Sequence, residues 1–180
     1  MLTLRPARPT DVTVILALIR ELADYERLAH EIEASEDDLH RALFGAAPRV
    51  FADVAEWCEG ATETQVVGFA LGFYTFSTFK GRHGLHLEDL FVRPSHRGRG
   101  IGQALLVNLA RRCVREGLGR LEWSVLDWNA PAIEFYRRLG AATHAEWVLQ
   151  RVSGEALQAL ASREIDCHAG DAAPGASAIR

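Results

Sequence analysis

The sequence predicts an α/β fold in which helices flank a central sheet of mixed strand direction. Short apolar segments typical of strands alternate along the 180 residues with longer segments whose apolar side chains recur every three or four positions, as in helices. Some expected strands follow one another across short polar connections, which indicates antiparallel hairpins, and others are separated by a helix, which indicates crossovers. This length suits one domain, which we expect to span residues 1–165.

The N-terminal third predicts one strand and two helices. Residues 2–5 are a short apolar segment suited to a first strand. Apolar side chains over residues 12–22 follow a helical i, i+3, i+4, i+7 pattern, and Thr10 precedes them as a candidate capping residue. Ser35 and Asp38 have the spacing of a capping box, so we expect a second helix to begin there.

The next part of the chain predicts an antiparallel hairpin. Residues 49–56 and 65–76 both have the composition of strands, and the polar loop 60–64 joins them. A second loop follows at residues 77–84. It contains two glycines and several basic side chains, so we expect it to be mobile and solvated.

The C-terminal half predicts alternating strands and helices and then a disordered tail. In order, the elements are a strand from Leu85, a helix that reaches Arg112, a strand at 121–126, a helix from the cap Asn129 to Leu139, a strand at 143–152 and a short helix at 154–161. Residues 166–180 are rich in Ala, Gly, Pro and Ser and lack apolar periodicity, so we expect them to be disordered.

Composition and charge exclude several classes of protein. The formal net charge of −4 argues against binding nucleic acid through bulk electrostatics. No segment approaches the ~18 consecutive apolar residues of a membrane span, and no secretory signal is visible, so a cytoplasmic protein is expected. The cysteines are odd in number and lack CxxC spacing, which favours neither a disulfide framework nor a metal site; they are Cys58, Cys113 and Cys167.

A glycine-rich basic turn between an expected strand and helix is the strongest local signal. Arg97 to Gly102 reads RGRGIG, in which glycines permit close approach of a ligand to the backbone. The next residue, Gln103, excludes the dinucleotide fingerprint GxGxxG, and no GK[ST] follows as in a Walker A loop. Backbone N–H groups in such a turn, together with the N-terminus of a helix, favour an anion such as a phosphate. The alternative is a solvated basic turn.

Several separated motifs resemble the GNAT superfamily of N-acetyltransferases, in particular its diamine (spermidine/spermine) acetyltransferases and their thialysine-acetylating relatives. The resemblance covers about residues 2–160 in matching order. The motifs are Tyr25-Glu26, Leu87-Glu88-Asp89, EDLFVRPSHRGRGIGQALL from residue 88, WNAP from residue 128 and FYRRLGA from residue 135. This resemblance implies a GNAT-like, mostly antiparallel sheet, acetyl-CoA as co-substrate, a small-molecule amine as acceptor, direct transfer in a ternary complex and a homodimer.

The resemblance also implies which residues bind acetyl-CoA. The backbone of one segment would meet the acetyl and pantetheine groups, the turn would hold the pyrophosphate, and the start of the next helix would contact the pantetheine arm. In that order the residues are Leu90, Phe91 and Val92; Arg97, Gly98, Arg99, Gly100, Ile101, Gly102 and Gln103; and Asn129, Ala130, Pro131 and Ala132.

By the same resemblance, Tyr136 would be the general acid and a further set of residues would face the amine: Tyr25, Glu26, Glu88, Glu122, Trp123, Ser124 and Glu146. A phenol of pKa ~10 protonates a thiolate of pKa ~8.5 uphill by roughly 2 kcal/mol. Core packing and an aromatic wall against the thioester are the alternatives for Tyr136.

The adjacent acids Glu88 and Asp89 are suited to amine chemistry. An alkyl amine of pKa ~10.4 is about 99.9% protonated near pH 7, and only the neutral form attacks a thioester. A carboxylate can attract the ammonium ion and accept its proton. Strand periodicity predicts that the two acids point to opposite faces. We expect Glu88 at the substrate, while Asp89 has the alternative of a structural hydrogen-bond acceptor.

The sequence departs from the polyamine-acetylating pattern at two places. Arg27, Leu28 and Ala29 follow Tyr25-Glu26 where those relatives carry more acids, and the acidic stretch before Trp147 shrinks to Glu146. Fewer acids predict an acceptor with less positive charge than spermine, such as an amino-acid-like or thialysine-like amine. Acetylation of protein or aminoglycoside-like amines, and a non-catalytic acyl-CoA-binding module, are the alternatives.

Overall fold

The computed structural model describes residues 1–60 and 64–163. The chain divides into two compact units, Met1–Asn129 and Ala130–Arg180. The expected tail at 166–180 and part of the expected loop at 60–64 lie outside the described residues. The prediction of one domain over residues 1–165 stays a prediction.

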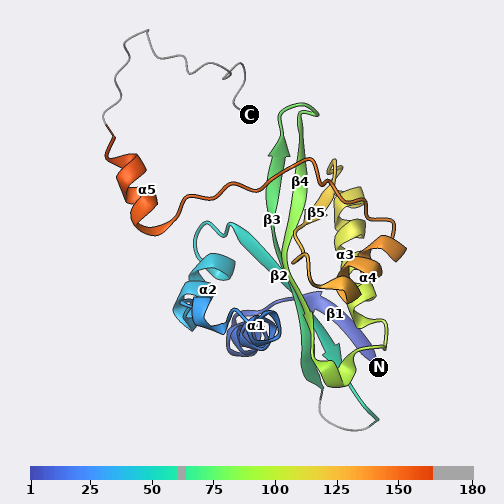
Figure 1. Cartoon of the computed structure of the whole chain (residues 1–180). Coiled ribbons are helices and arrows are strands. Elements are labelled where there is room, and N and C mark those ends of the chain that lie inside the picture. The colour runs from blue at the N-terminus through green and yellow to red at the C-terminus, as the bar shows by residue number, and fades with distance from the viewer. Residues whose placement is uncertain (61–63, 164–180) are drawn as a thin grey trace. The chain divides into compact units, whose positions relative to one another are not determined.

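The first unit contains a five-stranded sheet (Figure 1). Its strands, in both spatial and chain order, are β1 (Leu2–Pro6), β2 (Val50–Trp57), β3 (Gln65–Ser77), β4 (Arg82–Val92) and β5 (Leu121–Trp123). Neighbouring strands from β1 to β4 pair antiparallel, and β4 pairs with β5 in parallel. The predicted sheet of mixed, mostly antiparallel direction is therefore confirmed.

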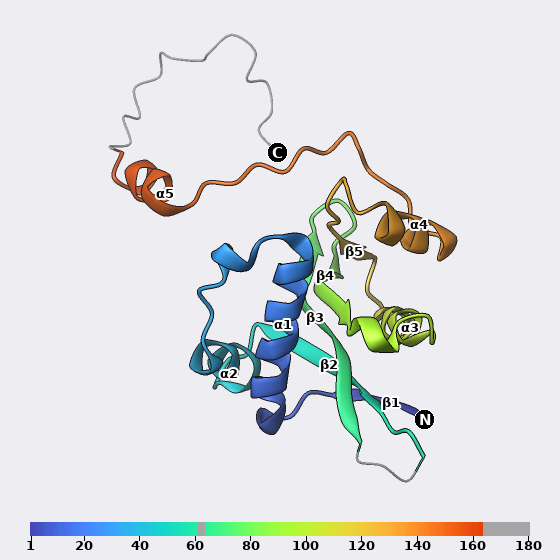
Figure 2. The ribbon, with the colours of Figure 1, turned by 60° about the horizontal axis from the view of Figure 1, so that its bottom comes forward.

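Helices cover both faces of this sheet. Figures 1 and 2 show α1 (Val12–Glu26) and α2 (Glu36–Phe44) on one face and α3 (Ile101–Arg115) on the other. On the α1 face, Ile15 packs in a buried cluster with Phe69 and Phe91 of the central strands. The α3 helix buries Leu105 and Leu109 completely. Burial of these apolar side chains provides the main stabilisation of the layers.

A buried polar contact links α3 to the sheet. Asp53 of β2 is only 1% exposed, and its carboxylate accepts hydrogen bonds from Asn108 at 3.0 Å and Arg112 at 3.4 Å. Burial raises the pKa of Asp53, and the nearby Arg112 guanidinium opposes that rise. These contacts satisfy the buried carboxylate and hold α3 against β2.

Local sequence signals determine where α1 and α2 begin, but the residue that caps α1 differs from the predicted one. The capping box of Ser35 and Asp38 is confirmed at the start of α2. Thr10, however, lies inside a 3-10 turn (Pro9–Asp11), and α1 begins after Asp11. The Asp11 carboxylate accepts from the Arg8 backbone N–H at 2.6 Å and from Arg5, so an aspartate rather than Thr10 organises this end.

Two strand boundaries differ from the predicted ones. β3 reaches Ser77 and β4 already begins at Arg82, so only residues 78–81 of the expected loop at 77–84 form a turn between two paired strands. β5 ends at Trp123 instead of residue 126, because its pairing with β4 covers only Leu85–Leu87.

The second unit contains α4 (Ala130–Arg138) and α5 (Gly154–Ala161), both predicted. Gly140 has a φ of 89° directly after α4, which fits its predicted role at the end of that helix. The predicted strand at 143–152 is wrong, since the described part of this unit contains no strand. A strand forms only where its backbone groups have a partner, and here Trp147, Val148 and Leu149 are exposed.

Among the described residues, no helix has the length and apolar character that crossing a membrane requires.

Candidate functional site

A β-bulge in β4 organises the candidate site. Leu71 of β3 lies opposite Asp89, and the next residue, Gly72, lies opposite Leu87. β4 thus advances two residues while β3 advances one, and Glu88 is the extra residue. Side chains of a regular strand alternate between its two faces, and the predicted orientations of Glu88 and Asp89 assumed this alternation. The bulge interrupts it.

As a result, both acids of β4 project from the face that α1 covers. Asp89 lies opposite Leu71, which belongs to the buried cluster on this face. The Glu88 carboxylate lies 3.8 Å from Nε2 of His86, which pairs with Phe73, two residues along β3 from Leu71. The prediction that Glu88 and Asp89 point to opposite faces is therefore wrong, because the bulge reverses the alternation between them.

Asp89 has an unusual electrostatic environment. It is half-buried, and its pKa is raised to about 6, mainly by burial and then by the negative charges of Glu88 and Glu26. Burial also raises the pKa of Glu26, at the end of α1. Three carboxyl groups from two elements thus converge. Their negative potential favours an ammonium ion at this place.

The part of β4 beyond the bulge has one open backbone edge. β5 pairs only with Leu85–Leu87, and β4 continues to Val92. Among the described residues, no strand pairs with the β5-side edge of Glu88–Val92. Leu90, Phe91 and Val92, the residues predicted to meet the thioester end of acetyl-CoA, lie in this segment. Unpaired N–H and C=O groups there are suited to an extended amide chain such as pantetheine.

The glycine turn follows β4 directly and has the expected backbone. Gly98 and Gly100 adopt φ values of 75° and 77°, and no atom lies within 4 Å of the position that a Cβ would take at either one. Gly100 caps α3, so the N–H groups of the first turn, including Ile101, Gly102 and Gln103, lack the helix-internal partners of later residues. This open concavity of N–H groups fits a pyrophosphate.

The two arginines of the turn are occupied by protein contacts. Arg97 donates from Nε to the Val92 carbonyl at 2.9 Å, and its guanidinium lies 5.0 Å from the Tyr25 ring centroid. Arg99 lies 3.4 Å from Glu59 and 5.0 Å from the Trp57 ring centroid. They therefore anchor the turn to neighbouring elements, and the backbone N–H groups are the part of the turn best suited to an anion.

The C-terminal end of α1 joins the same site. Tyr25 is 40% exposed and donates from its hydroxyl to Oδ1 of the buried Asn129 at 3.2 Å. Its ring lies 6.1 Å from that of Trp128, which is half exposed. Arg27 holds its guanidinium 6.0 Å from the Trp128 ring centroid and has a left-handed φ of 64°. The structure thus joins Tyr25, predicted for the amine, to Asn129, predicted for pantetheine.

Other predicted site residues are placed differently. Glu122 lies opposite His86 on β5, where Arg120 Nε at 2.9 Å and Thr75 Oγ1 at 3.2 Å contact its carboxylate. Trp123 is half-buried at the end of β5, and Ser124 follows it, exposed. These three residues therefore lie on β5 or directly after it, and β5 pairs with the part of β4 that precedes the bulge.

The remaining predicted residues belong to the second unit. Ala130, Pro131 and Ala132 form the first turn of α4. Tyr136 is half-buried on the same helix, with its ring 5.3 Å from that of Phe135. Glu146 is exposed; its own backbone N–H and His144 Nδ1, 3.1 Å away, lower its pKa. The catalytic role of Tyr136 stays a prediction.

Sequence reasoning missed two features of the site. It assigned no substrate role to Asp89, because a bulge leaves no visible mark in the residues LHLEDLF. It also favoured a core or interface position for Trp128, which is half exposed beside Tyr25. Two adjacent acids in an otherwise apolar strand were the one available signal for the first feature.

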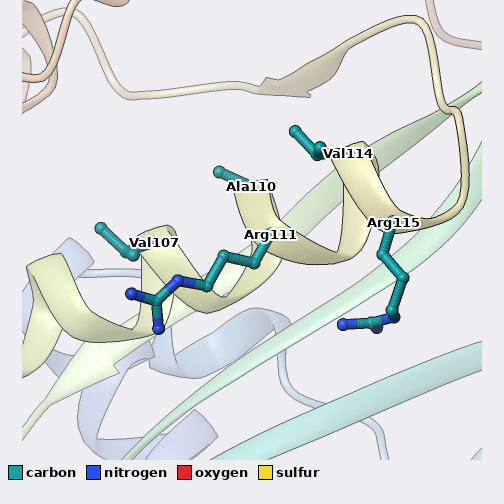
Figure 3. Close-up of a pocket in the computed structure, with 5 residues that line it drawn as sticks. All are labelled: Val107, Ala110, Arg111, Val114 and Arg115. Carbon is teal, nitrogen blue, oxygen red and sulfur yellow. The ribbon is translucent and has the colours of Figure 1, made fainter.

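A shallow apolar depression elsewhere on the first unit is separate from this site. It is formed by α3 alone, with Val107, Ala110 and Val114 projecting from one side of the helix (Figure 3). The guanidinium groups of Arg111 and Arg115 also line it. No residue predicted for the site lines this depression.

Comparisons with known proteins identify relatives of this chain. The model of the Acetyltransferase (GNAT) family matches residues 15–141. A thialysine N-epsilon-acetyltransferase of Bos taurus is 40% identical over 166 residues, which cover 89% of this chain and 97% of that protein. An L-ornithine N5-acetyltransferase of Arabidopsis thaliana is 34% identical, covering 87% of this chain and 86% of that protein. A solved integron cassette protein from Vibrio cholerae superposes with a TM-score of 0.73 at 28% identity, covering 90% and 98% of the two chains.

We predict that Gly98→Ala weakens acetyl-CoA binding about tenfold, since alanine disfavours the φ of 75° and would shift the backbone N–H groups of the turn. Its left-handed φ also makes the substitution cost about 1 to 2 kcal/mol of folding free energy. Gly81→Ala is the matched control, because Gly81 has a φ of 56° with equally open surroundings but lies in the β3–β4 turn. Calorimetry and thermal unfolding measure both effects. An equal loss of acetyl-CoA affinity in the two variants would contradict the assignment of the pyrophosphate to the turn that contains Gly98.

Proposed function

Since this chain belongs to the acetyltransferase (GNAT) family and is an acetyl-CoA-dependent N-acetyltransferase, we propose that its acceptor is a small amino acid whose side chain ends in a primary amine. The names of the two relatives described above, which act on thialysine and on ornithine, support this choice. The observation that carries the proposal is the pairing of an acidic cluster with a neighbouring arginine.

The acidic cluster suits the reacting end of such an acceptor. Glu26 and Glu88 both place their carboxyl groups near that of Asp89, as their effect on the pKa of Asp89 indicates. An ammonium group is attracted to this region before it loses its proton. The open edge of β4 beyond the bulge offers a place for the thioester beside the same residues.

Arg27 suits the other end of the acceptor. It follows Glu26 in the chain and lies over Trp128, beside Tyr25. A guanidinium group pairs well with a carboxylate and repels a second ammonium group. An amino acid with a side-chain amine therefore fits the combination of charges better than a polyamine does. The left-handed backbone at Arg27, costly for a residue with a Cβ, is consistent with a functional position.

The proposed reaction is direct attack of the neutral amine on the thioester in a ternary complex. Leu90–Val92 and the turn from Arg97 to Gln103 would bind acetyl-CoA, with Asn129–Ala132 along its pantetheine arm. Tyr136 would protonate the departing thiolate, a role supported by its place in the FYRRLGA motif. The uphill transfer of roughly 2 kcal/mol is acceptable where the leaving sulfur carries little free charge.

A comparison of L-ornithine with putrescine tests the acceptor, because the two differ only in the α-carboxylate. We expect the wild-type kcat/KM to be higher for ornithine, and Arg27→Gln to lower the ornithine-to-putrescine ratio about tenfold. Thiol release from acetyl-CoA is the measurement, with spermine as a third acceptor. Arg111→Gln, on the outer side of α3, is the control and leaves the ratio unchanged. Equal activity on spermine and on ornithine would refute the proposal.

Tyr136→Phe tests the general acid. We expect kcat to fall by about 10² to 10⁴, while acetyl-CoA affinity stays within twofold, because the ring remains and only the proton donor is lost. Phe135→Leu alters the adjacent ring and keeps the hydroxyl, so it controls for packing. A small effect of Tyr136→Phe on kcat would leave Tyr136 as an aromatic wall.

We also propose a homodimer in which the segment 143–152 pairs with a second copy. This segment was expected to be a strand, it has no strand partner among the described residues, and Val148 and Leu149 are each 75% exposed. Sedimentation equilibrium should give a dimer for the wild type and a monomer for Leu149→Lys. Val114→Lys, at an exposed valine of α3, should leave the dimer intact. The reverse result would place the interface on α3. The cytoplasmic location expected from the sequence belongs with these proposals.

A further inference from the structure

We propose that His86 sets the affinity of the site for the acceptor's ammonium group, because its protonated imidazole competes with that group for Glu88. His86 is then a specificity-determining residue, and it takes no part in the transfer of the acetyl group or of a proton. The inference deepens the proposed function and rests on it in one respect, namely that the acceptor arrives as an ammonium ion.

Packing holds the His86 ring beside the acidic cluster of Glu26, Glu88 and Asp89. In the sheet, His86 pairs with Phe73 of β3 on one side and with a residue of β5 on the other. Its ring stacks on that of Phe73, with the centroids 4.9 Å apart and 28° between the planes. Only 23% of the side chain is exposed. The stacked ring therefore has a fixed position on the face of β4 that carries the acids.

The contact between His86 and Glu88 depends on the charge of the imidazole. Nε2 of His86 lies 3.8 Å from Oε2 of Glu88, which is too long for a hydrogen bond but within reach of an ion pair. A neutral imidazole at this distance leaves the carboxylate to the acceptor. A protonated imidazole places a positive charge where the ammonium group would bind. Histidine is the side chain that ordinarily changes its charge between about pH 5 and pH 8.

The acid that faces His86 from β5 already has partners of its own. Glu122 lies opposite His86 in the sheet. Its carboxylate lies 2.9 Å from Nε of Arg120 and accepts a hydrogen bond from Oγ1 of Thr75 at 3.2 Å. The Arg120 guanidinium neutralises this acid, so a positive charge on His86 acts mainly on Glu88, whose side chain is 57% exposed.

The remaining charges near His86 belong to Asp89 on its own strand and Glu26 at the end of α1. Within the described part of the chain, no hydrogen bond or ion pair reaches the Asp89 carboxylate. Burial, Glu88 and Glu26 raise the pKa of Asp89 to about 6, so Asp89 also gains a proton on the acid side of neutral pH. That loss of negative charge is common to the wild type and to variants at His86, and it cancels when they are compared at one pH.

Protonation of His86 thus offsets one negative charge of the acidic cluster. The acceptor should bind more weakly at pH 6 than at pH 8, beyond the part that Asp89 contributes. Both side chains of the pair contact water, and ion pairs of this kind change an equilibrium about three- to fivefold. The resulting enzyme favours amine acceptors more strongly as the pH rises through neutrality.

His86→Phe tests the competition, because it keeps an aromatic ring against Phe73 and removes the charge. Acceptor affinity is measured by calorimetry on protein saturated with CoA, with L-ornithine or the amine that the wild type acetylates fastest. At pH 6 the variant should bind the acceptor about three- to fivefold more tightly than the wild type, and at pH 8 within twofold of it. His86→Lys, charged at both pH values, should bind the acceptor weakly at both.

A merely structural role of His86 predicts the opposite result, since loss of a supporting contact weakens binding at every pH. Weaker or unchanged acceptor binding by His86→Phe at pH 6 would therefore overturn the proposal. His83→Phe is the matched control: His83 is an exposed histidine of the same strand whose ring lies 5.1 Å from that of Phe76. Its acceptor affinity should follow that of the wild type at both pH values.

A double-mutant cycle identifies the group through which His86 acts. In a Glu88→Gln background, His86→Phe should leave acceptor affinity at pH 6 unchanged, because the carboxylate for which the two cations compete is gone. A gain in affinity that persists in this background would refute competition at Glu88. A wild type that prefers spermine to ornithine would refute the proposed acceptor instead, and the same cycle then runs with spermine, which also arrives as an ammonium ion.

Discussion

One extra residue in β4 determines most of what this site can do. Strand pairing holds β4 between β3 and β5, and the bulge at Glu88 occurs where the pairing with β5 ends. Bulges bend a strand and increase its twist, so a paired edge before Glu88 becomes an open edge after it. The extra residue also places the side chain of Asp89 on the same face of the sheet as that of Glu88. One local irregularity thus creates both the open backbone edge proposed for the thioester and the acidic cluster proposed for the amine.

Arg97 links the glycine turn to the end of β4 and to the end of α1. Its Nε–H holds the end of β4 at Val92, and its guanidinium lies over the rings of Tyr25 and Phe91. Tyr25 in turn donates to Asn129. Contacts from the glycine turn therefore reach the end of α1 and the loop after β5. Charged and aromatic groups that are packed in this way preorganise a site more firmly than exposed side chains do.

The acidic cluster shows the opposing demands of stability and activity. Like charges near one another, one of them half-buried and without donors, cost folding free energy. The well-packed cores on both faces of the sheet, and satisfied carboxylates such as Asp53, allow the fold to tolerate that cost. Strain of this kind is concentrated where a ligand relieves it.

The sequence alone determined the strand–turn–helix unit around Gly98, the capping box at Ser35, the order of helices and strands as far as α4, and the family. These depend on local periodicity, special backbone angles and motifs that adjoin in the chain. Only the tertiary structure decided the direction of Asp89, the anchoring of Arg97 and Arg99 and the contact between Tyr25 and Asn129. Each depends on pairing register or on residues distant in sequence, which no local pattern encodes. The segment 143–152 shows the same limit in the opposite sense: the apolar residues Trp147, Val148 and Leu149 favour a strand, but a strand forms only where its backbone groups have a partner.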